Sequence, residues 1–213
     1  MTERRGRFIS LEGGEGAGKS TLLAGLRAHI AGQGIDLVQA REPGGTPVGE
    51  AVRAIVLDPA LRGMAAETEL LLMFASRAQL VRETIAPALA AGRWVLCDRY
   101  VDASYAYQGG GRGQPPARIA ELERWTCDGV SPDLTLLLDL PVATGRARAA
   151  GRGGADRIEA EADAFFERVR ERYRARAAAE PARFRVIDAG QSPEDVLRAA
   201  VAALEPLFAE GAA

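Results

Sequence analysis

A glycine-rich segment near the start of the chain constrains its fold more than any other feature. Residues 13–20 read Gly-Gly-Glu-Gly-Ala-Gly-Lys-Ser, which matches the pattern G-x-x-x-x-G-K-[ST]. The apolar run Phe8–Glu12 before it has the length of a buried strand, and leucines at helical spacing follow it. A strand, a glycine loop and a helix in this order form a cradle whose backbone N–H groups bind phosphate. The pattern therefore predicts a loop that binds a nucleoside triphosphate.

Two side chains of this loop have predictable roles. In such loops the lysine reaches the β- and γ-phosphates and the following hydroxyl binds Mg²⁺, which are the roles of Lys19 and Ser20. Lys19 is the single lysine among 27 lysine and arginine residues, which indicates a position that needs a compact ammonium group. The predicted nucleotide contacts are Gly13, Gly14, Glu15, Gly16, Ala17, Gly18, Lys19, Ser20 and Thr21.

Short apolar segments alternate with helical patterns along the whole chain. The predicted strands are Phe8–Glu12, Asp36–Ala40, Trp94–Asp98, Leu134–Asp139 and Phe184–Asp188. This alternation is typical of an α/β fold, and with the phosphate loop it predicts the P-loop NTPase fold, with a central parallel sheet of about five strands. Helices should flank the sheet, and a mobile lid should complete a single domain over residues 1–213.

Two further predictions concern local structure. A long helix is expected from about Glu67 towards Ile85, with its end near Pro87, because proline disfavours the residues before it in a helix. The glycine-rich stretches Gly109–Gly113 and Gly151–Gly154 are expected to form mobile surface loops.

Composition excludes several classes of protein. Hydrophobic residues make up 47% and charged residues 26% of 213, which suits a soluble core. The net charge of −2 argues against a dedicated binder of nucleic acid or of membrane surfaces, and no apolar run approaches the ~20 residues of a membrane span. Cys97 and Cys127 lack metal-ligand spacing, and His29 is the single histidine. We therefore expect a protein of the reducing cytoplasm without a nucleic-acid or membrane partner.

Two aspartates compete for the second metal position of a phosphate-loop protein. Asp98 and Asp139 each end an apolar run, which is where a carboxylate that holds Mg²⁺ is expected. Asp98 is favoured because Arg99 follows it directly and could bridge the donor and acceptor phosphates. Asp139, which precedes Pro141, is interpreted as a carboxylate at a strand end or helix cap.

The chain resembles the bacterial thymidylate kinase family closely. Five segments carry the resemblance, in the order of the family and across nearly the whole chain: Gly13–Ser20, Arg41–Thr46, Asp98–Tyr100, Tyr107–Gly113 and Asp156–Glu159. The Arg-Glu-Pro-Gly-Gly and Gln-Gly-Gly-Gly-Arg-Gly strings within them are far more specific than the phosphate loop. The resemblance implies transfer of the ATP γ-phosphoryl group to dTMP, with Mg²⁺ as cofactor, in a homodimer.

The resemblance also implies which residues surround the acceptor. Arg53 and Arg99 match the arginines that the family uses for the acceptor phosphate. Glu42, with Pro43 beside it, and Glu15 match acidic positions near the sugar, its 3′-hydroxyl and the metal. Glu15 is expected to organise substrate and metal. It is not expected to act as a general base, because the acceptor phosphate is already ionised.

Recognition of the base is implied in the same way. Phe74 and Arg77 match positions where the family stacks on the thymine ring and reads it. In many relatives the aromatic residue lies four positions before the arginine, where this chain has Met73, so the residue that faces thymine is left open. Three residues match the stretch on the other side of the nucleoside: Ser104, Tyr107 and Gln108.

The lid is expected over residues 146–158. The variable loop positions 14–17 contain no arginine, and the bacterial subtype that shares this feature supplies its catalytic arginine from the lid. Arg152 aligns with that arginine, and Arg148 is a candidate to cover the adenine ring. Arg146 is either a weaker lid contact or part of a solvated face.

Two other functions are alternatives to the one that the resemblance implies. Another P-loop nucleoside monophosphate kinase with a different base choice would share most of these motifs. A GTP-binding switch protein would need an Asn/Thr-Lys-x-Asp motif to read guanine, and Lys19 is already used in the phosphate loop. The second alternative therefore cannot be built in its usual form.

Overall fold

The five predicted strands form one parallel sheet. The structure is a computed structural model that describes residues 6–150 and 156–212. Its strands are β1 (Phe8–Gly13), β2 (Leu37–Arg41), β3 (Trp94–Asp98), β4 (Leu134–Asp139) and β5 (Phe184–Asp188). They are hydrogen-bonded in the order β2-β3-β1-β4-β5, and every neighbouring pair is parallel. The α/β fold and all five strands are confirmed, with bounds within one residue of those predicted.

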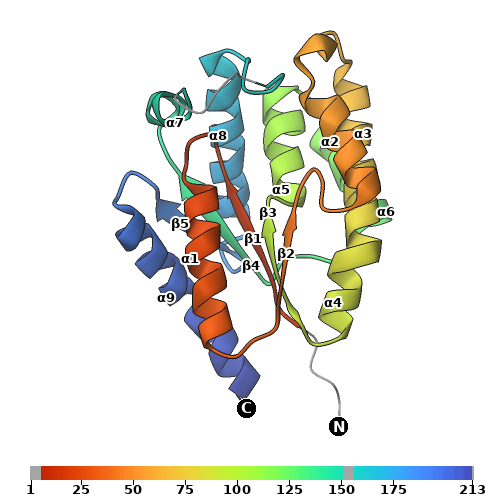
Figure 1. Ribbon diagram of the computed structural model, residues 1–213. Coiled ribbons are helices and arrows are strands. Elements are labelled where there is room, and N and C mark those ends of the chain that lie inside the picture. The colour runs from red at the N-terminus through yellow and green to blue at the C-terminus, as the bar shows by residue number, and fades with distance from the viewer. Residues whose placement is uncertain (1–5, 151–155, 213) are drawn as a thin grey trace.

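Helices cover both faces of the sheet (Figure 1). Ile9 and Leu11 of β1 face α1 (Lys19–Gly32) and α9 (Pro193–Ala212), whereas Phe8 points to the opposite face. The other helices are α2 (Pro47–Leu57), α3 (Ala66–Leu80), α4 (Ala86–Ala90), α5 (Val101–Ser104), α6 (Pro116–Cys127), α7 (Val142–Ala149) and α8 (Asp163–Ala179). Among the helices of the described residues, none has both the length and the apolar character needed to cross a bilayer.

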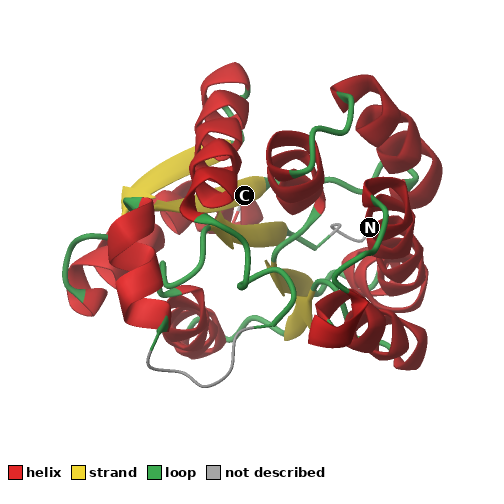
Figure 2. Ribbon diagram, turned by 90° about the horizontal axis from the view of Figure 1, so that it is seen from above, coloured by secondary structure: helices red, strands yellow, loops and turns green. Residues whose placement is uncertain are grey.

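The carboxyl ends of the strands meet at one edge of the sheet. β1 is central, with β2 and β3 on one side of it and β4 and β5 on the other. The register places Leu11 and Arg41 opposite Asp98, and Asp139 opposite Asp188. Viewed from above, helices surround the strands and loops lie between them (Figure 2). In open α/β sheets, ligands bind at the carboxyl ends of the strands, next to the strand where the order changes direction. In this sheet that strand is β1.

The stretch Gly109–Gly113 is not a mobile loop, so this prediction was wrong. Most of it belongs to a buried π-helical segment, Tyr105–Gly111, which packs against α8. A Cβ on Gly110 would lie 2.7 Å from the carbonyl oxygen of Arg168, and one on Gly111 would lie 2.3 Å from the Phe165 ring. Here glycine permits two helical segments to approach closely, and the composition of the stretch alone does not distinguish this from flexibility.

The long helix also differs from expectation at its carboxyl end. The helical path begins at Ala66, passes through a π-helical turn at Val81–Ile85, and continues as α4 to Ala90. Pro87 lies in the first turn of α4, directly after the π-helical turn. The π-helical turn resets the hydrogen-bond pattern, so proline is accommodated there without ending the path.

Candidate active site

A cavity of about 330 Å³ opens at the carboxyl ends of β1, β2 and β3. The phosphate loop borders one side of it, and α2, α3 and the Tyr105–Gly111 segment border the other. Most predicted site residues line this cavity: Glu15, Gly16, Ala17, Gly18, Lys19, Ser20, Glu42, Pro43, Arg53, Asp98, Arg99, Tyr107 and Gln108. Phe74, Arg77 and Ser104 lie behind its wall, each no more than 1% exposed.

The phosphate loop forms between β1 and α1 as predicted. Gly16 and Gly18 have positive φ angles of 70° and 91°, and a Cβ on Gly16 would lie 2.0 Å from the carbonyl oxygen of Gly145 in α7. The Lys19 Nζ donates to the carbonyl oxygens of Gly13 and Gly14 at 3.1 and 3.0 Å. Burial and the Arg99 charge lower the pKa of Lys19 to about 8. A phosphate anion in the loop would stabilise the charged ammonium.

Arg99 is held at the centre of the cavity wall. Its backbone has a φ of 69°, a left-handed conformation that is rare outside glycine and often marks functional positions. The Arg99 Nη2 donates to Glu15 at 2.7 Å and to the Tyr107 hydroxyl at 3.0 Å, and Tyr107 donates to Glu15 at 2.8 Å. Burial would lower the pKa of Arg99, but Tyr107 and Glu15 raise it well above its ordinary value, so the guanidinium stays charged.

A buried carboxylate lies behind Arg99. Glu12, at 0% exposure, accepts hydrogen bonds from the backbone N–H of Tyr100 and the hydroxyl of Tyr173, both at 2.7 Å. Arg99 in turn donates to the Tyr173 hydroxyl at 3.2 Å. Burial and the nearby Asp102 carboxylate raise the pKa of Glu12 to about 8, which Arg99 opposes. Tyr173 therefore links α8 to Arg99 and to the end of β1.

Asp98 presents an acceptor that fits a metal ion. Its Oδ1 is buried and has no hydrogen-bond partner within the described residues, and Asp98 lines the cavity together with Ser20. In the described part of the chain, no three His, Cys, Asp or Glu side chains gather closely enough to hold a metal. A magnesium ion here would therefore take its remaining ligands from phosphate oxygens and water, as Mg²⁺ commonly does.

Asp139 has the role expected of a strand-end carboxylate. It ends β4 and forms a two-point ion pair with Arg170 of α8, with distances of 2.7 and 3.0 Å. Both oxygens are thus engaged, in contrast to Asp98.

Arginines line the rim of the cavity near its acceptor side. The Arg53 Nη1 donates to the Pro43 carbonyl oxygen at 3.1 Å, and Arg41 pairs with Glu50 at 2.7 Å. Arg41 and Arg53 both line the cavity, and burial together with the Arg41 charge lowers the pKa of Arg53. Such a rim favours an anionic group between them.

The opposite wall is built on a fully buried arginine. The Arg77 Nε donates to Glu42 Oε2 at 2.8 Å, and its Nη1 donates to the Ser104 Oγ at 3.0 Å. Burial raises the pKa of Glu42, against the influence of Arg77. The second oxygen of Glu42, Oε1, is buried without a partner among the residues described. Arg77 thus fixes one end of Glu42, while the other end stays available to a ligand on the cavity side.

Met73 lines the cavity, whereas Phe74 is 1% exposed in the core between sheet and helices. The Arg77 guanidinium carbon lies 4.5 Å from the centre of the Phe74 ring, a cation–π contact. The direct stacking of Phe74 on a base stays a prediction, as does base reading by Arg77.

Gln108 lines the cavity with its amide fixed from behind. Its Nε2 donates to Glu69 Oε1 at 2.9 Å, and its Oε1 is buried without a partner among the described groups. Glu69 also binds Arg112 at 3.1 Å and Arg157 at 2.6 Å. The buried Glu69 carboxylate thus connects α3 to Gln108, to Arg112 and to Arg157.

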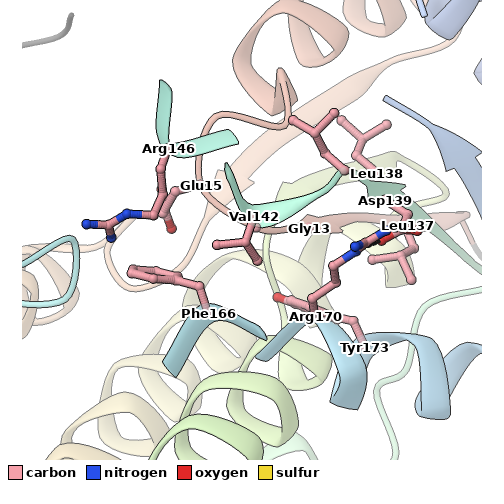
Figure 3. Close-up of a pocket in the computed structure, with 12 residues that line it drawn as sticks. Gly13, Glu15, Leu137, Leu138, Asp139, Val142, Arg146, Phe166, Arg170 and Tyr173 are labelled. Carbon is pink, nitrogen blue, oxygen red and sulfur yellow. Dashed lines mark hydrogen bonds and ion pairs between the residues drawn. The ribbon is translucent and has the colours of Figure 1, made fainter. Parts of the chain in front are cut away.

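A second, much smaller cavity lies between the phosphate loop and α8 (Figure 3). Arg146 of α7 extends beside Phe166, with its guanidinium carbon 5.1 Å from the ring centre, and it pairs with Asp163 at 2.8 Å. Arg148 donates to the Ala189 carbonyl oxygen at 2.9 Å, in the loop between β5 and α9. Arg152 lies outside the described residues, so its predicted lid role stays a prediction.

Several cavity or supporting residues were missed by sequence reasoning. Arg41, Asp156 and Glu159 line the cavity, and all three belong to strings that carried the family resemblance. Glu69 and Tyr173 support the cavity from behind. They lie on helices among other charged and apolar residues, and no local pattern distinguishes them from ordinary helix positions.

Comparisons with known proteins agree with this geometry. A family model described as Thymidylate kinase matches residues 11–200. The thymidylate kinase of Alkalilimnicola ehrlichii is 59% identical over 201 residues, which cover 94% of this chain and 93% of that protein. Those of Pseudomonas syringae pv. tomato and Ectopseudomonas mendocina are 56% and 54% identical, and cover 90% and 96% of this chain and 91% and 97% of their own. With the phosphate loop, the cavity and these relatives in agreement, the chain belongs to the thymidylate kinase family.

Proposed function

We propose how the residues of the 330 Å³ cavity divide the work of phosphoryl transfer to dTMP. The chain is a nucleoside monophosphate kinase that phosphorylates dTMP, and ATP is the donor in this family. The observation that carries the assignment of roles is the division of the cavity wall. Lys19, Arg99 and backbone N–H groups lie on its phosphate-loop side, with Asp98 placed for a metal ion. On the other side, Glu42 and Gln108 each have a buried oxygen without a partner among the described residues.

The phosphate loop and Lys19 bind the ATP phosphates. The backbone N–H groups of residues 13–20 and the positive end of α1 are the sequence-independent part of this site. Lys19 adds a compact charge, since its Nζ already lies within 3.1 Å of two loop carbonyls at the mouth of the loop. The Lys19 ammonium moves onto the β- and γ-phosphates when ATP binds.

Ser20 and Asp98 hold the magnesium ion of the ATP complex. The Asp98 Oδ1, which has no partner among residues 6–150 and 156–212, supports this assignment, because a buried carboxylate oxygen without a donor is costly unless a cation binds it. Bound Mg²⁺ neutralises charge that develops on the transferred group. Asp98 and the Ser20 hydroxyl would be the protein groups that hold this ion.

Arg99 spans the donor and acceptor phosphates. Its guanidinium is locked by Glu15, Tyr107 and the Gly13 carbonyl oxygen, at distances of 2.7 to 3.0 Å. Fixed donors stabilise a transition state without reorganising, which is the largest effect available to a phosphoryl-transfer enzyme. Glu15 positions Arg99 and has no proton to remove, since the acceptor phosphate is already an anion.

The acceptor binds along α2 and α3. Arg53 takes the dTMP phosphate at the cationic rim, and Glu42 with Pro43 closes around the sugar. The base then lies against Met73, between the Glu42 and Gln108 oxygens that find no partner in the part of the chain that the structure describes. These oxygens are acceptors only, so they favour groups that donate: a sugar hydroxyl and the N–H of a thymine ring. Tyr107 lies across the sugar and disfavours a ribose 2′-hydroxyl.

The lid supplies the remaining charge. Arg152 is proposed as the arginine that stabilises the transferred group, and Arg148 as the cover of the adenine ring. Arg148 already donates to the Ala189 carbonyl oxygen in the loop after β5, and we place the adenine ring beside that loop. Arg146 is engaged by Asp163 and Phe166 and has a supporting part.

A second copy of the chain is proposed to cover the groove between α3 and α6. Leu71 is 56% exposed and Trp125 is 76% exposed on its edges, while Phe74 forms its floor. Large exposed apolar side chains around one groove are typical of an interface. Sedimentation of the wild type should give a dimer, and Trp125→Asp should shift it to a monomer; a monomeric wild type at micromolar concentration would refute the proposal. We also propose that the enzyme works in the cytoplasm, supported by the unpaired buried thiols of Cys97 and Cys127.

One assay tests the proposed function. Release of ADP is measured by a coupled enzyme reaction with ATP, Mg²⁺ and each of dTMP, dUMP, dCMP and UMP. The kcat/KM for dTMP should be the highest, with dUMP intermediate because one methyl group is worth roughly 1–3 kcal/mol. Equal kcat/KM values for dTMP and dCMP would favour the alternative of a kinase with a different base choice.

A further inference from the structure

We propose that Glu69 of α3 determines which end of the Gln108 amide faces the acceptor base, and thereby sets the preference for thymine over cytosine. The inference rests on the proposed role of Gln108 as a base contact. Glu69 itself lies behind the cavity wall, so it acts as a positioning residue through Gln108.

The two ends of a glutamine amide have opposite hydrogen-bonding character. Nε2 donates and Oε1 accepts, so the side chain reads a ligand differently in each of its two orientations. The Gln108 Nε2 lies 2.9 Å from Glu69 Oε1, and both side chains are no more than 1% exposed. An ionised carboxylate has only acceptors, so the reverse orientation would set two oxygens against each other in a buried place. Glu69 therefore permits one orientation of Gln108.

Two arginines keep Glu69 ionised and fixed. The Arg157 Nη2 lies 2.6 Å from Glu69 Oε2, and the Arg112 Nε lies 3.1 Å from the same oxygen. Burial would raise the pKa of Glu69, but the hydrogen bond from Gln108 and the two arginines lower it below its ordinary value. Glu69 consequently carries no proton to offer to Gln108 at neutral pH.

The other end of Gln108 is the end left for a bound base. Its Oε1 is buried and finds no partner among the described residues, although Gln108 lines the cavity. Thymine has a single ring N–H, at position 3, whereas cytosine has a bare nitrogen acceptor there. The Gln108 Oε1 can accept a hydrogen bond from the thymine N–H, whereas it repels the nitrogen acceptor of cytosine. Sites that pair a buried polar group in this way discriminate by far more than sites that read shape alone.

The same carboxylate has a separate anchoring role. Arg157 also donates to the Val56 carbonyl oxygen of α2 at 2.7 Å, so Glu69 ties the segment that begins at Asp156 to α2 and α3. The two roles use different partners. Orientation runs through Glu69 Oε1 and Gln108, and anchoring runs through Oε2 and Arg157.

The decisive variant is Glu69→Gln, which keeps the size of the side chain. The new amide oxygen can accept from Arg157, which leaves its NH₂ group towards Gln108 and forces that amide to turn over. A donor then faces position 3 of the base. We expect the ratio of kcat/KM for dTMP to that for dCMP to fall at least about tenfold, mainly through a higher KM for dTMP. The KM for ATP should be unchanged.

Two controls separate orientation from general damage. Glu67→Gln lies on the same helix and also accepts from a glutamine amide, Gln114 at 3.2 Å, but outside the cavity, so the substrate ratio should stay at the wild-type value. Arg157→Gln removes the anchor, while Arg112 still pairs with Glu69 and the Gln108–Glu69 bond remains, so the variant should lower kcat without changing the ratio.

The double variant Glu69→Gln/Gln108→Glu keeps the proposal falsifiable if the single variant is unstable. It restores the amide–carboxylate bond with the partners exchanged and returns an acceptor oxygen to the cavity edge, so the dTMP preference should recover relative to Glu69→Gln. A Glu69→Gln enzyme with lower turnover but an unaltered ratio, or a double variant without recovery, would overturn the inference and leave Glu69 as an anchor. A wild type that does not prefer dTMP would instead refute the proposed function.

Discussion

The two sides of the cavity use arginine in opposite ways. On the phosphate-loop side, Arg99 lines the cavity itself and offers its charge to an anion. On the base side, Arg77 and Arg157 lie behind the wall, where they fix the carboxylates of Glu42 and Glu69.

This contrast shows that arginine can either bind a ligand directly or hold the carboxylate that recognises it. A guanidinium in contact with phosphate supplies charge that few other groups can match. A guanidinium behind a carboxylate makes that carboxylate a fixed acceptor, and a fixed acceptor distinguishes bases by what they can donate. Changes on the phosphate side should therefore reduce turnover, and changes on the base side should alter substrate choice.

The largest effect is expected at Lys19. Lys19→Ala removes the charge from the bridging region of ATP and should reduce phosphoryl transfer to near background while the thermal unfolding temperature is retained. Lys19→Arg should also be poor, because a planar guanidinium does not fit a loop shaped for an ammonium. The coupled ADP assay measures both; near-normal turnover of Lys19→Ala would break the phosphate-side assignment.

The second-largest effect on turnover is expected from Arg152→Ala. Arginines that stabilise the transferred phosphoryl group contribute on the order of 10³–10⁵ in rate, so kcat should drop strongly with little change in dTMP binding. Arg146→Ala should have a milder effect, since Asp163 and Phe166 already engage Arg146. If Arg152→Ala weakened dTMP binding and left kcat intact, Arg152 would belong to ground-state binding.

Arg77→Ala tests the base side. It leaves Glu42 as an unpaired buried carboxylate, and removal of one partner of such a pair typically costs about 3–5 kcal/mol of stability. Among molecules that remain folded, the dTMP-to-dCMP ratio of kcat/KM should fall more than the affinity for ATP. Denaturant titration and the substrate panel measure the two effects. An unchanged ratio would remove Arg77 from base recognition.

A smaller effect is expected from pH. The pKa of Glu12 is raised to about 8 in the folded protein from 4.5, so the folded state binds the extra proton between these values. Its contribution to stability is complete below about pH 4.5 and is lost as pH rises through about 8. Glu12→Gln should therefore reduce the fall in unfolding free energy between pH 5 and 8, by roughly 1–3 kcal/mol. Urea titrations at several pH values measure this; parallel pH profiles for both proteins would contradict it.

Sequence predicted the elements that depend on local patterns. The strand–loop–helix unit around Lys19 and the short apolar strands have strong local signals, and their bounds agree with the structure. The buried helical form of Tyr105–Gly111 could not be predicted in this way, since its glycines are explained by α8, which lies far along the chain.

The residues of the candidate site differ in the same way in how well the sequence predicts them. Glu42, Asp98 and Gln108 belong to contiguous motifs of the family, so they could be identified from the family resemblance. Glu69 supports Gln108 from 39 positions away in the sequence, and Tyr173 supports Arg99 from 74 positions away. Such contacts depend on how helices pack, and no spacing in the sequence encodes them.

The division between the two sides is tested most directly by titrating dTMP into the Lys19→Ala protein in a calorimeter. Our account predicts a Kd for dTMP within a few-fold of the wild-type value in a protein that no longer transfers phosphate, because the acceptor is held by Arg53, Glu42 and Gln108. Loss of dTMP binding together with turnover would contradict it, since the two sides would then form one inseparable site.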